Sequence, residues 1–348
     1  MKIGRRAQVA REYTIAPEHI LEVHDLHVDI KVDDYLLNAV RGVDFVMRKG
    51  ETLGLVGESG CGKSVTSKQV LGINPDNCSA RGEILFRTKS GKVLNLLEME
   101  KDGAAYRAIR GAEMAMIFQE PMTAFSPLYT IGNQLTEIIH LHEPEVTKAE
   151  ARARVLEMLK KVGIANPEKR IDQYPHEFSG GMLQRALIAM MLCCNPDVLI
   201  ADEPTTALDV TIQAQILELM KSLQKEFGMS ILFITHDLGT VANMCDNVAV
   251  MYLSQIVEYG TVRQIFHNPR HPYTKGLLRS LPKMNQSRDE KLYVIDGVVP
   301  LPVNMPPCCG FQDRCEHRLE GVCACRDIPE YTVEPGHMVR CALMEQEV

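Results

Sequence analysis

The stretch Gly57–Ser64 constrains the fold of this chain more than any other part of its sequence. The apolar run Leu53–Val56 before it predicts a buried strand, and Val65–Leu71 after it predicts the start of a helix. A glycine-rich turn between strand and helix, ending in Lys-Ser, is the P-loop arrangement, in which backbone N–H groups surround phosphate oxygens. Lys63 would reach the β- and γ-phosphates, and the Ser64 hydroxyl would ligate Mg²⁺. The sequence therefore predicts a nucleotide phosphate site made by Gly57, Glu58, Ser59, Gly60, Cys61, Gly62, Lys63, Ser64 and Val65.

The composition of the 348-residue chain is that of a globular protein with an acidic balance, and its formal net charge is −7. Nucleic-acid binders usually carry a basic stripe, and we find none in the sequence, which argues against a general nucleic-acid partner. The longest apolar run, Ala186–Cys194, is half the roughly 20 residues that a spanning helix needs, and residues 1–20 lack an apolar signal core. We therefore expect a cytosolic protein, or one attached to a membrane only through partners.

The order of the predicted elements indicates an α/β protein built around the P-loop. The alternating stretch Leu21–Lys31 and the apolar positions of 39–45 predict a small antiparallel β-layer. Short apolar strands alternating with helices favour a parallel sheet with ligands at its carboxyl ends, and residues 125–185 are predicted to be a mostly helical insertion. Beyond Gly260, frequent prolines indicate a separate, loop-rich C-terminal module. The predicted division is an extension (1–20), a nucleotide-binding domain (21–260) and a C-terminal domain (261–348).

Four polar residues follow predicted strands and are candidates for chemistry on the nucleotide. Asp202 and Glu203 end the run Val198–Ala201, where an aspartate can hold Mg²⁺ through water and the adjacent glutamate can polarise an attacking water. Gln119 ends another strand and would touch Mg²⁺ or the lytic water, and His236 ends a third and would hydrogen-bond a γ-phosphate. Acidic pairs often cap helices and a lone histidine is usually structural, but the P-loop nearby favours the catalytic interpretation.

A second glycine-rich turn, Phe178–Arg185, opens an apolar helix. Its serine cap and glycines predict a further anion site, with Ser179, Gly180 and Gly181 as binding residues. One nucleotide does not need two such sites in one subunit. We therefore expect this turn to serve the nucleotide of a partner subunit.

Taken together, these segments resemble the motifs of an ABC-type ATPase in their order along the chain. The matching segments are Gly57–Ser64 for Walker A, Gln119 for the Q-loop, Phe178–Arg185 for the signature, Val198–Glu203 for Walker B, Ala207–Asp209 for the D-loop and His236 for the H-loop. A closer similarity, over about residues 20–345, is to the ATP-binding subunits of oligopeptide/dipeptide-type importers. It is carried by Gln119–Thr123, Tyr174–Glu177, Ala201–Val210 and His271–Thr274.

The resemblance implies a head-to-tail dimer of nucleotide domains, in which the Walker motifs of one subunit and the signature of the other enclose each ATP. Ser179 and Gly181 would then contact the γ-phosphate held by the other subunit, and Asp209 would pass between the two sites. Family members usually pair with a second, different ATPase subunit, two membrane permeases and an extracytoplasmic binding protein, which implies a peripheral place on the cytoplasmic face of the inner membrane. Many ABC proteins stack adenine on an aromatic near the end of the first strand; this chain has Ile30 there, with Tyr35 as a substitute.

Six of the eleven cysteines lie after residue 307, which in a reducing compartment favours a metal site over disulfides. The spacing of Cys309, Cys315, Cys323 and Cys341 excludes the C-x₂-C knuckle of common zinc modules but permits a four-thiolate cluster or irregular zinc. The tail also resembles a cysteine pattern that binds a [4Fe-4S] cluster in some family members. We therefore expect such a cluster, with zinc or free buried cysteines as alternatives.

The sequence leaves alternatives open for the transported substrate and for whether the ATPase belongs to a transporter. Peptides are the expected cargo, while nickel, glutathione and oligosaccharide stay open because relatives with this tail also serve them. A remote alternative is an ABC ATPase without a transporter, acting on DNA or ribosomes. Such proteins insert long coiled coils or carry two cassettes, whereas this chain has one cassette and an acidic balance. A P-loop kinase would leave the Phe178–Arg185 turn and His236 unexplained.

Overall fold

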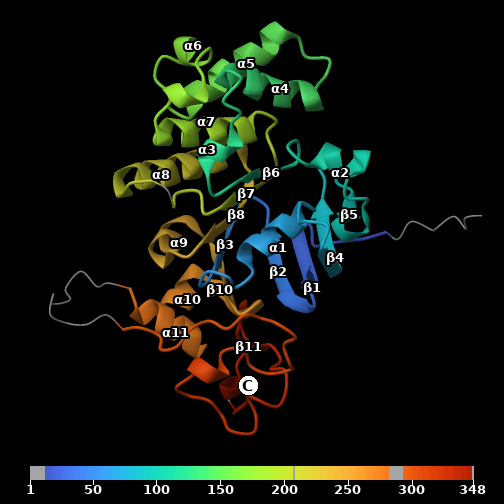
Figure 1. Cartoon of the computed structure of the whole chain (residues 1–348), viewed down its shortest axis with the longest axis vertical. Coiled ribbons are helices and arrows are strands. Elements are labelled where there is room, and N and C mark those ends of the chain that lie inside the picture. Colours follow the sequence, from blue (N-terminus) through green and yellow to red (C-terminus); the bar gives the residue numbers. More distant parts are fainter. Residues whose placement is uncertain (1–11, 207, 282–292, 347–348) are drawn as a thin grey trace, which may run out of the picture.

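The structure is a computed structural model that describes residues 12–206, 208–281 and 293–346. Most of the expected N-terminal extension and Ala207 of the D-loop resemblance lie outside the described residues. The molecule is elongated, with a group of helices at one end, two sheets in the middle and the C-terminal residues at the other end (Figure 1). The P-loop and the strand ends that carry Gln119, Asp202 and His236 belong to the middle part, whereas the Phe178–Arg185 turn belongs to the helical end.

The main sheet has eight strands in the order β11-β12-β10-β9-β3-β8-β7-β6. Its central strands, from β9 to β6, run parallel, and β10, β12 and β11 continue the sheet antiparallel. The parallel strands are buried along their whole length, because helices and the second sheet cover both faces. The strands are β3 (Thr52–Val56), β6 (Met114–Ile117), β7 (Val198–Asp202), β8 (Ser230–Thr235), β9 (Asn247–Tyr252), β10 (Gln255–Thr261), β11 (Tyr331–Glu334) and β12 (His337–Val339).

The second sheet is antiparallel, with the strand order β2-β1-β4-β5. Apolar residues alternate along β1 and face the main sheet, so that Val28 and Val43 share one core with Leu55 of β3 and Ile200 of β7. Helix α1 (Lys63–Val70) begins directly after the P-loop and packs into the same core. The remaining elements here are β1 (His19–Val32), β2 (Tyr35–Arg48), β4 (Cys78–Arg87), β5 (Val93–Asn95), α2 (Ala104–Ile109) and the 3₁₀ turn Leu96–Glu98.

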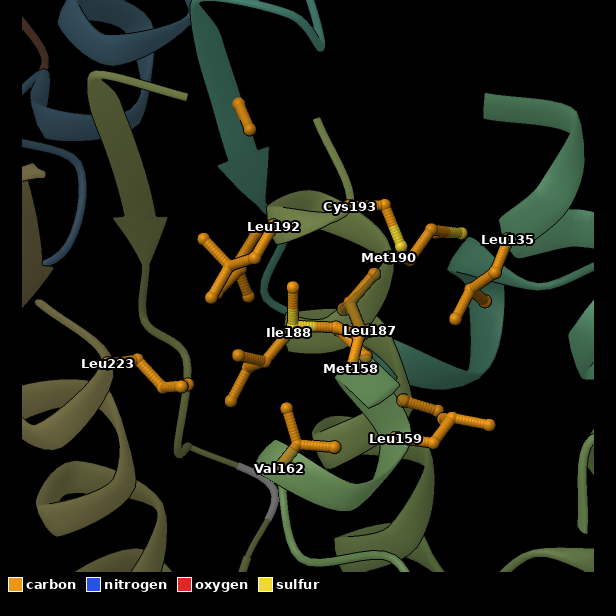
Figure 2. Packing of buried hydrophobic residues seen from close by; sticks show 14 of the residues in the cluster. Leu135, Met158, Leu159, Val162, Leu187, Ile188, Met190, Leu192, Cys193 and Leu223 are labelled. Carbon is orange, nitrogen blue, oxygen red and sulfur yellow. The ribbon is translucent and has the colours of Figure 1, made fainter. Parts of the chain in front are cut away.

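Between β6 and β7 the chain forms the helical end of the molecule. Thr147 and Glu150 make a capping box at the start of α5, which fixes where that helix begins. The helices bury their apolar faces against one another, and Figure 2 shows Leu135, Leu159 and Leu187 gathered in this core. The elements are α3 (Pro121–Ala124), α4 (Ile131–His142), α5 (Lys148–Lys161), α6 (Pro167–Arg170), the 3₁₀ turn Pro175–Glu177 and α7 (Gly180–Leu192).

The remaining helices lie along one side of the main sheet in this view and lead toward the C-terminal part (Figure 1). Asp209 caps the longest of them, α8, and Gly228, with a φ of 68°, ends it. Among the residues that the structure describes, no helix is both long enough and apolar enough to cross a membrane. These helices are α8 (Val210–Phe227), α9 (Leu238–Met244), α10 (Val262–His267) and α11 (Pro272–Arg279), and the 3₁₀ turns are Gln312–Arg314 and Ala342–Gln346.

The C-terminal residues are not the separate module that the proline spacing predicts. Strand β12 pairs with β10, with Val339 opposite Glu258, so the last hairpin extends the main sheet. Phe311 packs in one apolar cluster with Tyr252 of β9 and Tyr273 of α11. Prolines interrupt local helices and strands, but they do not prevent a segment from packing on a sheet edge. The P-loop α/β fold is confirmed, and its C-terminal residues are continuous with it.

Candidate functional site

The P-loop lies at the carboxyl end of β3 and is pressed against its neighbours. A Cβ atom added to Gly57 would lie 2.0 Å from the carbonyl oxygen of Met251. A Cβ on Gly62, whose φ is 103°, would lie 2.3 Å from the carbonyl oxygen of Ala39. Only glycine fits at these two positions, which explains the glycine pattern of the turn.

Lys63 is buried, and its ammonium is held against the loop itself. Its Nζ donates to the carbonyl oxygen of Gly57 at 2.8 Å and to that of Glu58 at 3.1 Å. The positive charge therefore sits inside the turn, at the N-terminus of α1, where two features favour a phosphate. The arrangement fits the polyphosphate of a nucleotide.

The pair formed by Ser64 and Asp202 fits Mg²⁺. The Ser64 hydroxyl donates to Oδ1 of Asp202 at 3.0 Å, so a hydroxyl from α1 and a carboxylate from β7 meet in front of the P-loop. Both are the hard oxygen ligands that Mg²⁺ takes together with phosphate and water. Burial raises the pKa of the Asp202 carboxyl, because its charged form loses solvation.

Three side chains converge on the carboxylate of Glu203. Gln119 Nε2 and Thr206 Oγ1 each donate to its Oε2 at 3.0 Å, and His236 Nδ1 lies 3.2 Å from its Oε1. Glu203 has a φ of 48°, a left-handed conformation that is strained for a residue with a side chain. The structure thus brings together Gln119, Glu203 and His236 as the sequence places them, and adds Thr206, to which the sequence analysis gave no role.

The predicted second anion turn lies apart from the P-loop. The Ser179 hydroxyl accepts from the backbone N–H of Met182 at 3.4 Å and caps α7. A Cβ on Gly181 would lie 3.0 Å from Cγ2 of Ile212 on α8, whose N-cap is Asp209. The contacts of this turn and of Asp209 are therefore made within α7 and α8, while Gly180 has open space beside it.

Tyr35, the predicted substitute for the adenine-stacking aromatic, lies beside the tight turn between β1 and β2. It pairs with Val32 across that turn, and 62% of its surface is exposed. Ile30 lies two residues before Val32 and is half-buried. The base contact therefore stays a prediction.

The residue Glu58 is held by two side chains that the sequence analysis did not assign to the site. Its backbone N–H donates to the Tyr273 hydroxyl at 3.0 Å, and Arg314 Nη1 donates to its Oε2 at 2.8 Å. Tyr273 lies in His271–Thr274, a segment that carries the family resemblance, and Arg314 directly precedes Cys315. Their position in or beside segments that resemble the family was the only feature of the sequence that could have pointed to a role for Tyr273 and Arg314.

The prediction of an iron–sulfur cluster at the C-terminal cysteines is wrong, and so is the zinc alternative. Across the described residues, no group of three or more histidine, cysteine, aspartate or glutamate side chains is arranged to hold a metal ion. Every cysteine is a free thiol, and the four candidates lie near one another but pack among the residues of three apolar clusters. Burial raises the pKa of Cys309 to about 12 and that of Cys341 to about 11, which keeps them as neutral thiols.

Comparison with protein families finds two matches along the chain. Residues 40–206 match the family described as "ABC transporter", and residues 257–323 match "Oligopeptide/dipeptide transporter, C-terminal region". Two similar relatives come from Bacillus subtilis (strain 168), and each is 49% identical to this chain. The oligopeptide transport ATP-binding protein OppD aligns over 94% of this chain and 90% of its own length, and the dipeptide transport ATP-binding protein DppD over 94% and 96%.

Solved structures with the same fold are ATP-binding cassettes. The cassette MJ0796, in a dimeric post-hydrolysis state bound to ADP and Pi, aligns with a TM-score of 0.61 at 23% identity, over 70% of this chain and 99% of its own. The protein cbiO1 from Clostridium perfringens, part of the ABC transporter complex cbiONQ, aligns with a TM-score of 0.59 at 28% identity, over 72% and 92%. Both alignments extend the likeness to the three-dimensional fold.

Proposed function

The chain belongs to the ABC transporter family, as an ATP-binding subunit of the oligopeptide/dipeptide type, and from this we propose that it powers the import of di- and oligopeptides. Its activity is ATP hydrolysis. The names of its relatives and the match of its C-terminal region support peptides as the cargo; importers of nickel, glutathione or oligosaccharide are the alternative.

The observation that carries the proposal is the convergence of Gln119, Thr206 and His236 on Glu203. Glu203 is the general base that orients the attacking water, Gln119 holds the water or the metal, and His236 hydrogen-bonds the γ-phosphate. Lys63 and the backbone of the P-loop bind the phosphates. Ser64, Asp202 and Gln119 would hold Mg²⁺, which would supply positive charge to neutralise the phosphates of the nucleotide.

A second subunit completes each ATP site. Ser179 and Gly181 have their contacts within α7 and α8, and Gly180 has open space beside it, which supports a role toward the nucleotide of another subunit. In this arrangement Asp209 lies between the two sites. We further propose that the second subunit is a different ATPase, so that the working assembly is a heterodimer.

The remaining partners follow from the family. Two permease subunits in the inner membrane bind this subunit on the cytoplasmic face, and an extracytoplasmic binding protein delivers the cargo. We keep the division into 1–20, 21–260 and 261–348 as a proposal for regions of one continuous fold, with Tyr35 as the proposed contact for adenine.

The experiment that tests this function measures ATP hydrolysis by the purified chain alone and in the assembled transporter reconstituted in vesicles. We expect slow hydrolysis by the isolated chain, and faster hydrolysis on assembly with stimulation by a peptide-loaded binding protein. Uptake of a labelled tripeptide that depends on internal ATP would support the cargo. Stimulation by nickel, glutathione or an oligosaccharide, with no response to peptides, would replace peptides as the cargo. Rapid turnover by a proven monomer would contradict the two-subunit site.

A further inference from the structure

Two residues from the C-terminal part of the chain form hydrogen bonds with Glu58 of the P-loop. Arg314 makes two contacts with the Glu58 carboxylate, from Nη1 to Oε2 at 2.8 Å and from Nη2 to Oε1 at 3.3 Å. The Tyr273 hydroxyl accepts from the Glu58 backbone N–H at 3.0 Å. A single P-loop residue is thereby held at both its backbone and its side chain.

Arg314 is itself fixed from several sides, so it can act as a rigid support. Only 7% of its side chain is exposed. Its Nε donates to the carbonyl oxygen of Asp296 at 2.9 Å, its Nη2 to that of Ile295 at 3.2 Å, and its Nη1 to the Tyr252 hydroxyl at 3.3 Å. Burial opposes its charge, but the hydrogen bonds to Glu58 and Tyr252 raise the pKa of the guanidinium. The pair is therefore an ordered, two-pronged contact, unlike a mobile surface ion pair.

Glu58 is also in contact with Lys63, the lysine proposed to bind the phosphates. The carbonyl oxygen of Glu58 accepts from Lys63 Nζ at 3.1 Å. A shift of Glu58 would therefore move an acceptor of the ammonium and change the shape of the turn. Arg314 and Tyr273 each contact Glu58, and Glu58 in turn contacts Lys63, so the C-terminal part is linked to the nucleotide site through one residue.

We propose that Arg314 and Tyr273 are positioning residues for nucleotide binding, which hold Glu58 so that the P-loop keeps its binding-competent shape. The C-terminal part of the chain thereby sets the affinity of the site for ATP. The inference rests on the proposed function, since it takes Mg-ATP as the ligand of the P-loop. Neither residue touches the reacting atoms, so they affect binding more than the chemical step.

The test compares the dissociation constant of Mg-ATP for the full chain and for the variants Arg314→Gln, Glu58→Gln and their combination. We expect Arg314→Gln to raise the constant about tenfold, as when the competent loop is populated about a tenth of the time. The double variant should bind no more weakly than the weaker single variant, because both remove the same contact. Arg314→Lys should be intermediate, since lysine keeps the charge but not the two-pronged contact. In the assembled transporter, kcat at saturating ATP should stay within about twofold while KM rises.

A control at an exposed two-pronged pair is Arg152→Gln. Arg152 also makes a two-pronged contact, with Asp172 at 2.9 and 2.8 Å, but it lies on α5 in the helical end of the molecule. This variant loses the same chemistry away from the P-loop and should leave the dissociation constant unchanged. Tyr273→Phe keeps the buried ring and removes only the acceptor for the Glu58 N–H, so it should weaken binding independently of Arg314.

The outcomes separate this inference from the function on which it rests. If the unaltered chain does not bind Mg-ATP, the proposed function fails. If it binds, and Arg314→Gln and Tyr273→Phe bind equally well, the positioning role is overturned while the function stands. Where Arg314→Gln does not fold, Glu58→Gln decides: unchanged affinity overturns the role, and weaker affinity at an unchanged melting temperature supports it.

Discussion

The carboxyl edge of the parallel sheet and the C-terminal cysteine segment both gather reactive side chains, but in opposite surroundings. At the sheet edge, Glu203 receives hydrogen bonds from Gln119 and Thr206 and lies against His236. In the cysteine segment, Cys323 packs with Ile328 and Ala342, and Cys341 packs with Val339 and Met344. One region keeps polar groups paired and reachable, and the other buries thiols among apolar groups.

The difference teaches that sheet topology brings chemistry together more reliably than spacing along the chain does. Parallel strands β6, β7 and β8 lie side by side, so the residues that follow them must meet at one edge. The C-terminal cysteines lie on loops and turns, where no repeated element fixes the relative directions of their side chains. A thiol that finds apolar neighbours behaves as a small hydrophobic residue.

The first prediction concerns Glu203, where a substitution is expected to have the largest effect on activity. Glu203→Gln removes the proposed general base, so the turnover of the assembled transporter should fall by about 10²–10⁴-fold while ATP affinity is retained. Steady-state hydrolysis and nucleotide binding measure the two effects separately. Glu168→Gln is a suitable control, because Glu168 is an exposed acid paired with Lys160 on the helical end. Turnover near that of the unaltered protein would remove Glu203 from the mechanism.

A second variant separates binding from chemistry at the same edge. Lys63→Ala removes a buried charge that is proposed to bind the phosphates, and should weaken Mg-ATP binding by about 10–100-fold, the range expected for hydrogen bonds to charged groups. Equilibrium binding of ATP to the purified chain measures it. Lys160→Ala, at an exposed lysine, should bind normally. An unchanged affinity in Lys63→Ala would count against the P-loop as the phosphate site.

Much of the candidate nucleotide site at the carboxyl edge of the parallel sheet could be predicted from the sequence, because its motifs encode backbone geometry. Gly57 and Gly62 are required by contacts of 2.0 and 2.3 Å that a Cβ would make. Asp202 and Glu203 follow a continuous apolar run, which marks the end of a buried strand. The nucleotide site was therefore predicted from local patterns, although the roles of its residues remain predictions.

The contacts made across the fold could not be predicted in the same way. Arg314 reaches Glu58 across 256 positions of sequence, and no local pattern records that pairing. Val339 lies opposite Glu258 because the last hairpin adds to the edge of the main sheet, which proline spacing does not reveal. For the cysteines, spacing permitted a cluster, but the directions of the side chains depend on tertiary packing.

Cys323 and Cys325 provide a test of whether the C-terminal cysteines stabilise the fold by apolar packing. Cys323 is buried and Cys325 is exposed. Cys323→Ser places a hydroxyl among apolar groups and should lower the free energy of unfolding by about 1–2 kcal/mol, whereas Cys325→Ser should change it by less than about 0.5 kcal/mol. Denaturant unfolding compares the two variants. Both should bind Mg-ATP as the unaltered chain does, and equal stability would refute apolar packing as the role of Cys323.

The smallest expected effect concerns Asp202, whose buried carboxylate is expected to lower the stability of the folded protein at neutral pH. Burial raises the pKa of this carboxyl, so the folded protein holds the proton more tightly than the unfolded chain does. The carboxyl therefore favours folding when protonated, and this contribution is lost as the pH rises through the raised pKa. Asp202→Asn keeps an acceptor for Ser64 without the charge, so it should melt about 2 °C above the unaltered protein near pH 7. The difference should shrink as the pH falls below the raised pKa of the folded state, because the Asp202 carboxyl is then protonated and uncharged like the amide of the variant. The same variant should lose the Mg²⁺ dependence of ATP binding. Thermal melts across this pH range, without nucleotide, check the first effect, and magnesium titrations check the second. A lower melting temperature for Asp202→Asn at neutral pH would mean that the buried charge stabilises the fold, and the trade between stability and metal binding at this edge would be refuted.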